Sequence, residues 1–317
     1  MSAEDDLLTP ERPPRQSVER TKNRSWSEIV VETLIRLSGI SAIVIIAFIF
    51  LFLLREGLPA FRQVSIGQLF GTRWYPIDNQ YGILSLLVGS LLVTFGAIII
   101  AVPLGLVTAV YLGEIAPSWQ REILKPFIEV LAGIPSIVLG FFGWIVLAPA
   151  IQKLGAPTGL TAFTGSLLLA YMSLPTIISV TEDALYSVPK VYRDGSLAIG
   201  ATRWQTIWRV TVPAARSGIV IAIMLGIGRA IGETMAVMLV TGNAANIPAL
   251  GPAAFFEPVR TMTATIAAEM GEVASGSLHY SVLFAIGIIL FVITFIINSL
   301  ASRLVGVDKT RRRGGQL

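Results

Sequence analysis

The chain alternates between long apolar runs and short polar connections, and this pattern sets its fold class. A bilayer core about 30 Å thick is crossed by roughly 20 apolar residues of helix, and several runs reach that length. Glycine and proline recur inside the runs, which membrane helices tolerate when neighbouring groups satisfy the freed backbone. The pattern predicts six transmembrane helices, over residues 34–54, 83–112, 127–150, 161–180, 217–241 and 280–304.

The composition indicates that lipid is the main solvent of the chain. Of 317 residues, 54% are hydrophobic and only 14% are charged, and the mean hydropathy is +0.72. Soluble domains are far more polar, so we expect an all-α membrane protein. There is no cysteine and one histidine, His279, which excludes thiolate and multi-histidine metal sites. We expect no catalysis and no bound cofactor, and the GxxxxGK[ST] loop of ATP-binding subunits does not occur.

Basic residues predict how the spans are oriented. With the N-terminus placed in the cytoplasm, 18 of the 24 Lys and Arg residues fall inside, one lies within a span and 5 fall outside. The outside residues are Arg55, Arg62, Arg73, Lys153 and Arg260. Because short cytoplasmic loops carry an excess of positive charge, both termini are predicted to be cytoplasmic. No small-residue cleavage site follows the first apolar run, so we interpret this run as an uncleaved membrane anchor.

Polar stretches divide the chain into regions. Residues 1–33 lack the apolar content to bury a core, so this N-terminal tail is predicted to be disordered in the cytoplasm. Residues 34–81 hold the first transmembrane helix and an external loop. Residues 82–304 form the membrane core, and residues 305–317 form a basic cytoplasmic tail. The basic tail suits an anionic lipid leaflet, so we expect contact with the bilayer and no nucleic-acid binding.

The longest cytoplasmic connection, residues 182–216, has helical signals of its own. Ser187-Val188-Pro189 can begin a helix, since proline is tolerated in a first turn. Gly200 can end that helix, because glycine readily adopts the left-handed conformation found after helix C-termini. The connection is therefore predicted to be structured, with a helix over about 189–199.

A second helix is predicted to follow at once. Thr202 and Gln205 have the spacing of a capping box, and Pro213 is expected to end the helix. Apolar side chains then fall on one face of this helix, at Trp204, Ile207 and Trp208. Such a face can lie on lipid headgroups or can dock on a partner protein, and the residue pattern alone leaves both open.

The same connection resembles the EAA loop of ABC importer permeases. The resemblance lies in Asp194-Gly195-Ser196-Leu197-Ala198-Ile199-Gly200-Ala201 and in the later Val212-Pro213. Asp194, Gly195 and Ser196 stand where the family has Glu-Ala-Ala, so only the acidic character of the first position is kept. The resemblance implies a type I ABC importer permease whose loop couples to an ATPase subunit. The implied coupling residues are Asp194, Gly195, Ser196, Gly200, Ala201, Trp204, Ile207 and Pro213.

Further segments resemble one branch of that family, the phosphate importer permeases of the PstC type, over roughly residues 74–304. The most specific is Gly228-Arg229-Ala230-Ile231-Gly232-Glu233-Thr234-Met235-Ala236-Val237. Others are Gly82-Ile83-Leu84, Leu131-Ala132-Gly133-Ile134-Pro135-Ser136, Leu174-Pro175-Thr176-Ile177, Thr181-Glu182-Asp183-Ala184-Leu185 and Pro213-Ala214-Ala215-Arg216-Ser217-Gly218. The resemblance implies a bacterial inner-membrane subunit that carries inorganic phosphate. Its implied partners are a sister permease, an external phosphate-binding protein and two copies of an ATPase subunit, which would use ATP and Mg.

Two charges lie inside the predicted fifth span. Arg229 and Glu233 are four residues apart, so on a continuous helix they share one face and can pair. Full charges in a span face protein or water, and they can either cement the bundle or line a substrate pathway. An arginine fork matches phosphate oxygens, which favours the pathway. Gly228 and Gly232 form a GxxxG pattern, for which helix packing is predicted.

Other functions fit the sequence less well. A permease of the same architecture could carry sulfate, molybdate or another solute. Only the resemblance around Arg229 favours phosphate over these cargoes. An ion-coupled secondary anion transporter usually shows internal repeats and several titratable groups within its spans, whereas this chain has few.

Overall fold

The computed structural model describes residues 26–249 and 251–314, and the chain divides into two compact units, residues 1–51 and 52–317. The division passes through the first helix, α1 (Trp26–Gln63). Of the predicted disordered tail, residues 1–25 lie outside the described residues. Residues 26–33 are helical, so the prediction was wrong there. The segment Trp26-Ser27-Glu28-Ile29-Val30-Val31 has enough apolar content to extend the helix.

Six of the described helical stretches are long and apolar enough to cross a membrane, so the predicted number of spans is confirmed. Their bounds are Val30–Gln63, Leu84–Ile115, Ser136–Lys153, Ala162–Tyr186, Arg203–Gly232 and Leu278–Leu300. The elements between and within them are shorter. They are α2 (Ile66–Leu69), β1 (Trp74–Tyr75), β2 (Gln80–Tyr81), α4 (Ser118–Ala132), α8 (Lys190–Ala198), α9 (Arg203–Thr206), α11 (Met235–Val240) and α12 (Met262–Glu269).

The third span differs from its prediction. It was expected over residues 127–150, but α4 ends before Gly133 and α5 (Ser136–Phe142) begins after Pro135. Proline removes a backbone donor and disfavours helical geometry at the residue before it, so the apolar run is split there. From α5 the chain continues through a π-helical turn, Gly143–Leu147, into α6 (Ala148–Lys153).

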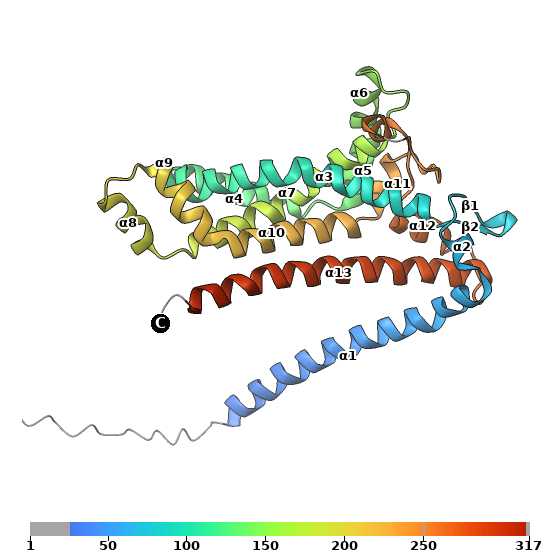
Figure 1. Cartoon of the computed structure of the whole chain (residues 1–317), viewed down its shortest axis with the longest axis horizontal. Helices are drawn as coiled ribbons and strands as arrows, with labels where there is room; N and C mark the ends of the chain where they lie inside the picture. Colours follow the sequence, from blue (N-terminus) through green and yellow to red (C-terminus); the bar gives the residue numbers. More distant parts are fainter. Residues whose placement is uncertain (1–25, 250, 315–317) are drawn as a thin grey trace, which may run out of the picture. The chain divides into compact units, whose positions relative to one another are not determined.

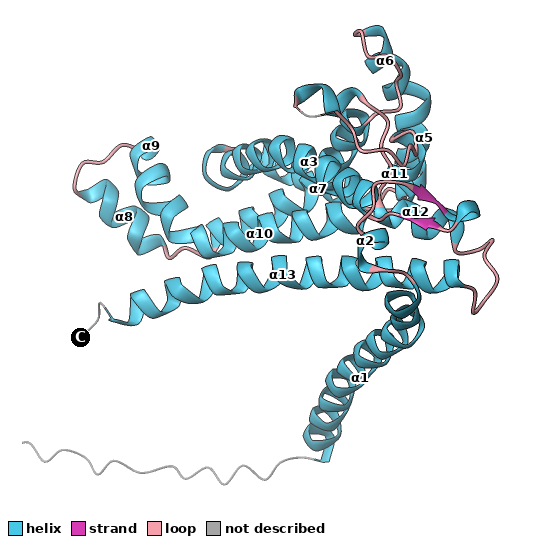
Figure 2. Ribbon diagram, turned by 45° about the vertical axis from the view of Figure 1, so that its right-hand side comes forward, coloured by secondary structure: helices cyan, strands magenta, loops and turns pink. Residues whose placement is uncertain are grey.

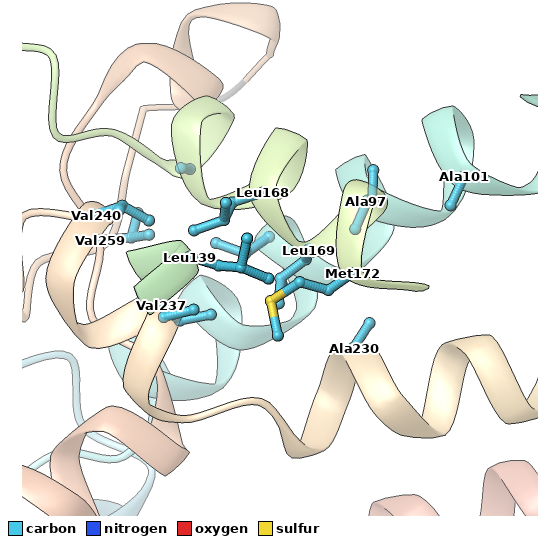
Figure 3. Packing of buried hydrophobic residues seen from close by; sticks show 14 of the residues in the cluster. Ala97, Ala101, Leu139, Leu168, Leu169, Met172, Ala230, Val237, Val240 and Val259 are labelled. Carbon is cyan, nitrogen blue, oxygen red and sulfur yellow. The ribbon is translucent and has the colours of Figure 1, made fainter. Parts of the chain in front are cut away.

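The core of the larger unit forms where α3 (Leu84–Val110), α7 (Ala162–Tyr186) and α10 (Val212–Gly232) pack together. Figure 1 and Figure 2 show α3 and α7 side by side, with α10 along them. Small residues permit the close approach. A Cβ placed at Gly105 or at Gly226 would come within 2.7 Å or 2.6 Å of the Ile177 side chain. Figure 3 shows buried side chains from α3, α5, α7, α10 and α11 meeting in one apolar cluster.

The last helix, α13 (Leu278–Gly314), runs beside α10. It also packs on the C-terminal part of α1, where a Cβ at Gly57 would meet Ile288 at 2.6 Å. Residues 305–314 of the predicted tail continue this helix, and 315–317 lie outside the described residues. We call the end of the bundle that bears α8 and α9 the loop end, and the opposite end, with β1, β2 and α12, the hairpin end. The strands pair antiparallel, Trp74 with Tyr81 and Tyr75 with Gln80.

Candidate functional site

The helix that carries Arg229 breaks immediately after it. α10 ends at Gly232, Glu233 adopts an extended conformation (φ −70°, ψ 134°), and α11 begins at Met235. The continuous span predicted over 217–241 was therefore wrong. Contacts from elsewhere hold the break: the Thr263 hydroxyl donates to the Glu233 carbonyl at 2.9 Å. The Glu233 carboxylate accepts from the backbone N–H of Ala236 at 3.3 Å, which helps to start α11.

The break separates Arg229 from Glu233. They do not share a helical face, and no ion pair joins them in the part of the chain that the structure describes. Arg229 lies in the last turn of α10, where the helix dipole favours a cation. Its Nε is buried and has no hydrogen-bond partner among the residues that the structure describes. Because buried donors are nearly always paired, an unpaired guanidinium nitrogen inside a membrane helix calls for a functional explanation. The arrangement does not fit an ion pair that cements the bundle.

The glycine pattern beside Arg229 does not pack on any described part of this chain. A Cβ at Gly228 or Gly232 would meet nothing within 4 Å. The close contacts of α10 are made instead by Gly218, against Ala184, and by Gly226, against Ile177. Gly226 and Gly228 are two residues apart, about 200° around the helix, so the packed face is opposite to the predicted one. Within the described residues no helix packs on Gly228 and Gly232, so the predicted helix packing stays a prediction, and the open face lies next to Arg229 in sequence.

Hydroxyl groups around the break were not predicted as site residues. Thr261 and Thr263 face each other with their Oγ1 atoms 3.2 Å apart, and both are buried. Ser90 of α3 accepts from the backbone N–H of Met262 at 2.9 Å, which fixes the start of α12 against α3. The run Thr261-Met262-Thr263-Ala264-Thr265 was the available signal, since three threonines in an apolar loop favour buried hydrogen bonding.

At the loop end, the predicted start and stop signals are confirmed. α8 ends at Ala198 and Gly200 has φ +90°, the left-handed conformation expected after a helix. Thr202 and Gln205 form both hydrogen bonds of the capping box at the start of α9. Pro189 is the N-cap residue of α8, one position before the helical turn in which we expected it. Five predicted coupling residues fall on or just after α8, namely Asp194, Gly195, Ser196, Gly200 and Ala201.

The second predicted helix differs in two respects. Pro213 does not end it, because the helical path runs from α9 through a π-helical turn, Ile207–Thr211, into α10. A π turn has i→i+5 hydrogen bonds and accommodates the missing proline N–H. Ile207 does not share the exposed face of the two tryptophans, since it is 5% exposed whereas Trp204 is 61% exposed. The predicted single apolar face was therefore wrong.

The exposed surface of the loop end is nevertheless rich in large apolar side chains. Trp204 and Trp208 pack edge to face with ring centroids 5.5 Å apart, and both stay accessible. Ile199, just before Gly200, is 86% exposed. We call Ile199, Trp204 and Trp208 the coupling patch. Exposed apolar surface, here with two tryptophan rings in contact, is typical of interaction sites.

Two enclosed ion clusters brace the loop end. Glu182 of α7 is 1% exposed and pairs with Arg121 at 2.6 Å and Lys125 at 3.3 Å, both on α4. Glu114, at the end of α3, pairs with Arg193 of α8 at 2.6 Å. Neither cluster was predicted from the sequence. Only their basic members had been considered there, in the count of cytoplasmic Lys and Arg residues. Both clusters fasten the short helices of the loop end to the long ones.

A third cluster lies at the hairpin end, around Glu269 of α12. Its carboxylate pairs with Arg260 and with His279, each at 2.8 Å, and accepts from Trp74 Nε1 at 3.0 Å. One carboxylate thus joins α12, α13 and β1. Burial raises the pKa of the neighbouring Tyr81 hydroxyl, so this group stays a neutral donor and contacts Asn79 at 3.4 Å.

We predict that Glu269→Ala destabilises the folded chain by about 1–3 kcal/mol, because the enclosed donors of Arg260 and Trp74 lose their acceptor. The unfolding temperature of the purified protein in detergent should fall by roughly 3–8 °C. The matched control is Glu272→Ala, which removes an exposed carboxylate three residues after Glu269. Equal unfolding temperatures for the two variants would show that the Glu269 cluster does not stabilise the folded chain.

Comparison with known proteins adds to this geometry. Residues 101–306 match the family model described as binding-protein-dependent transport system inner membrane component. The chain is 38% identical to the probable ABC transporter permease protein YqgH of Bacillus subtilis, across 87% of this chain and 90% of that protein. It is 35% identical to the phosphate transport system permease protein PstC of Mesorhizobium japonicum, across 95% and 96%. A chain in a crystal structure of a bacterial alginate ABC transporter, in complex with alginate pentasaccharide-bound periplasmic protein, superposes with a TM-score of 0.58 at 17% identity, covering 89% and 96%.

Proposed function

The chain belongs to the family of binding-protein-dependent transport system inner membrane components and has the fold of type I ABC importer permeases, and we propose that it forms the path for inorganic phosphate in an ATP-driven importer. The resemblance seen in its sequence to such permeases, and to their phosphate branch, is confirmed. The observation that carries the phosphate proposal is the buried, unpartnered Nε of Arg229 beside a break in α10.

Arg229 supplies what a desolvated anion requires. A guanidinium presents forked donors that match phosphate oxygens, and its charge offsets the cost of taking the anion out of water. The break after Gly232 places extended backbone next to it. Irregular backbone at membrane depth occurs where it lines a cavity or is buried in protein. Arg229 and the break together therefore support a pathway at this point of the helix.

Glu233 supplies selectivity in this proposal. Phosphate near neutral pH keeps at least one proton, so its hydroxyl can donate to a carboxylate, whereas fully ionised sulfate has no donor. Sulfate would meet a repelling charge and leave an acceptor unpaired. The empty site does not need an Arg229–Glu233 pair for this mechanism.

We predict that Glu233→Gln weakens discrimination against sulfate. The substitution keeps the size and one acceptor oxygen, which can still accept from the Ala236 N–H, but it adds donors for sulfate. Excess sulfate should inhibit phosphate uptake by the variant about 10-fold more strongly than uptake by the wild type. Thr234→Ser, next to it, is the control. Unchanged sulfate inhibition in Glu233→Gln would remove Glu233 from the selectivity step.

The proposed machinery for energy coupling lies at the loop end. The coupling patch would dock on an ATPase subunit, of which two copies are expected, and ATP and Mg would be used there and not by this chain. Exposed tryptophans support a protein contact, since buried aromatic anchors dominate many interfaces. The alternative, that these side chains rest on lipid headgroups, predicts reaction with lipid-phase probes in place of crosslinks to the ATPase.

Two further partners are proposed, one for the open glycine face of α10 and one for the hairpin end. The open glycine face at Gly228 and Gly232 suits close approach of another helix, and we assign it to a sister permease subunit. An external phosphate-binding protein would deliver the anion at the hairpin end. The excess of Lys and Arg in the loop-end connections supports an inner-membrane orientation with both termini in the cytoplasm.

Whole-cell uptake tests the proposal. Cells that lack this chain should lose high-affinity uptake of labelled phosphate, and its return from a plasmid should restore the uptake. Excess sulfate or molybdate should not compete. Loss of sulfate or molybdate uptake, with phosphate uptake intact, would instead favour a permease for another oxyanion.

A further inference from the structure

One arginine fastens the helix of the coupling region to the membrane core. Arg193, on α8, donates through Nη2 to Glu114 Oε1 at 2.6 Å and through Nε to Glu114 Oε2 at 3.3 Å. The same guanidinium donates to the backbone carbonyls of Val188 at 2.9 Å and Leu185 at 2.8 Å. It therefore joins α8, the end of α7 and the end of α3 in one cluster.

Glu114 is directed at Arg193 by local backbone geometry. It lies in the π-helical turn Tyr111–Ile115 that continues α3, and such turns occur frequently at functional sites. Neighbouring Gly113 lies against α7, where a Cβ would stand in ordinary contact distance, 3.6 Å, of the Leu185 side chain. The Glu114 and Arg193 side chains are only 9% and 21% exposed. A two-point, charge-assisted contact shielded in this way is stiffer and more specific than a surface ion pair.

The rest of α8 is attached weakly. No residue of α8 is buried, so apolar packing does not hold this helix on the core. Besides the contacts of Arg193, the structure shows one hydrogen bond from a side chain of α8, between the hydroxyls of Ser196 and Thr206 of α9, which lie 3.0 Å apart. A displaced α8 would thus pull on the end of α3 through Arg193, whereas the chain itself also joins α8 to α7 and to α9. The pull would reach α3 and α7, which pack along each other and on α10.

We propose that Arg193 is the positioning residue that transmits movement of α8 to α3 through Glu114 and to α7 through the Leu185 carbonyl. The inference rests on the proposed function, because it assumes that a partner ATPase moves α8. In this mechanism the coupling patch receives the force and the Arg193–Glu114 contact passes it to the core, so that cargo release follows ATP hydrolysis. Loss of the contact would leave docking and hydrolysis in place and would uncouple them from transport.

The test measures phosphate carried per ATP hydrolysed by the assembled complex in vesicles. For Arg193→Gln we expect normal assembly, continued hydrolysis and a ratio about 10-fold below that of the wild type. Glu114→Gln should lower the ratio in the same way, and Arg193→Lys should lower it less, because a point charge keeps the pairing but not the fork. Lys190→Gln, an exposed site on the same helix, should leave the ratio unchanged.

The chain contains no cysteine, which permits a rescue. The variant Glu114→Cys/Arg193→Cys should be uncoupled, and a short bifunctional maleimide that bridges the two thiols should raise the ratio again. If Arg193→Gln fails to assemble, Glu114→Gln and the double cysteine variant decide the question. A wild-type ratio in those variants would overturn the inference while wild-type phosphate transport stands. A wild-type complex that carries no phosphate would overturn the proposed function itself.

Discussion

Arg229→Met should reduce phosphate uptake about 30- to 100-fold while the subunit still inserts and assembles. A hydrogen bond from a charged donor contributes roughly 1.5–3 kcal/mol, and Arg229 would offer at least one to an anion that has left water. Because Arg229 has no ion-pair partner within the described residues, its removal leaves no carboxylate stranded. The loss should therefore appear in transport and not in stability. Initial rates of labelled phosphate uptake at matched protein levels measure it.

Two further variants separate charge from shape. Arg229→Lys should also be impaired, because an ammonium is a point charge that cannot reproduce the fork. Arg229→Met combined with Glu233→Leu should lower phosphate uptake at least as strongly as Arg229→Met alone, although both charges have been removed together. Leu225→Met, one turn earlier on α10 and 49% exposed, is the control for change on this helix. Normal phosphate uptake by the double variant would show that Arg229 does not line the pathway and has only a structural role in the helix bundle.

Gly200→Pro should abolish transport-linked ATP hydrolysis while leaving the chain in the membrane. Gly200 has φ +90° and its N–H donates to the Leu197 carbonyl at 3.0 Å. Proline fixes φ near −65° and has no N–H, so the turn between α8 and α9 must rebuild at a cost of about 3 kcal/mol or more. The coupling patch on either side of the turn would lose its arrangement. Stimulation of the ATPase by cargo in reconstituted vesicles measures the effect.

Trp204→Asp probes the same contact without straining the backbone. The side chain is 61% exposed, so the folded chain should tolerate the charge, and stimulated hydrolysis should fall more than 10-fold through loss of the partner contact. Ile207→Asp is not equivalent, since Ile207 is buried and the charge would destabilise the chain itself. A cysteine at Ala201 should crosslink to the ATPase subunit. Normal stimulation in Trp204→Asp, with no crosslink from Ala201, would favour the lipid-surface role.

Local signals in the sequence predicted those features that local chemistry determines. The number of spans follows from the lengths of the apolar runs, and the capping box at Thr202 and Gln205 and the left-handed Gly200 follow from side-chain chemistry within a few residues. The split at Gly133 and Pro135 had a visible signal as well. It was misjudged because membrane helices can also carry such residues without breaking.

The features that were missed depend on contacts distant in sequence. No proline marks the break after Gly232, which is held in part by Thr263 from another segment. The π turn at Ile207–Thr211 changes the helical period, which a pattern of 3.6 residues per turn does not take into account. The sequence therefore wrongly predicted that Ile207 shares the face of the tryptophans and that the helix ends at Pro213. The ion pairs of Glu182 and Glu114 join residues from separate helices, and a single sequence gives no signal for such pairs.

Cargo selection is the central claim, and ATP-driven uptake into vesicles that contain the purified, assembled complex tests it most directly. With the binding protein and ATP present, labelled phosphate should accumulate against its gradient, and a large excess of sulfate should not slow it. Withholding ATP should stop accumulation even when an ion gradient is imposed. Accumulation of sulfate in place of phosphate, or phosphate uptake driven by the ion gradient alone, would contradict the claim.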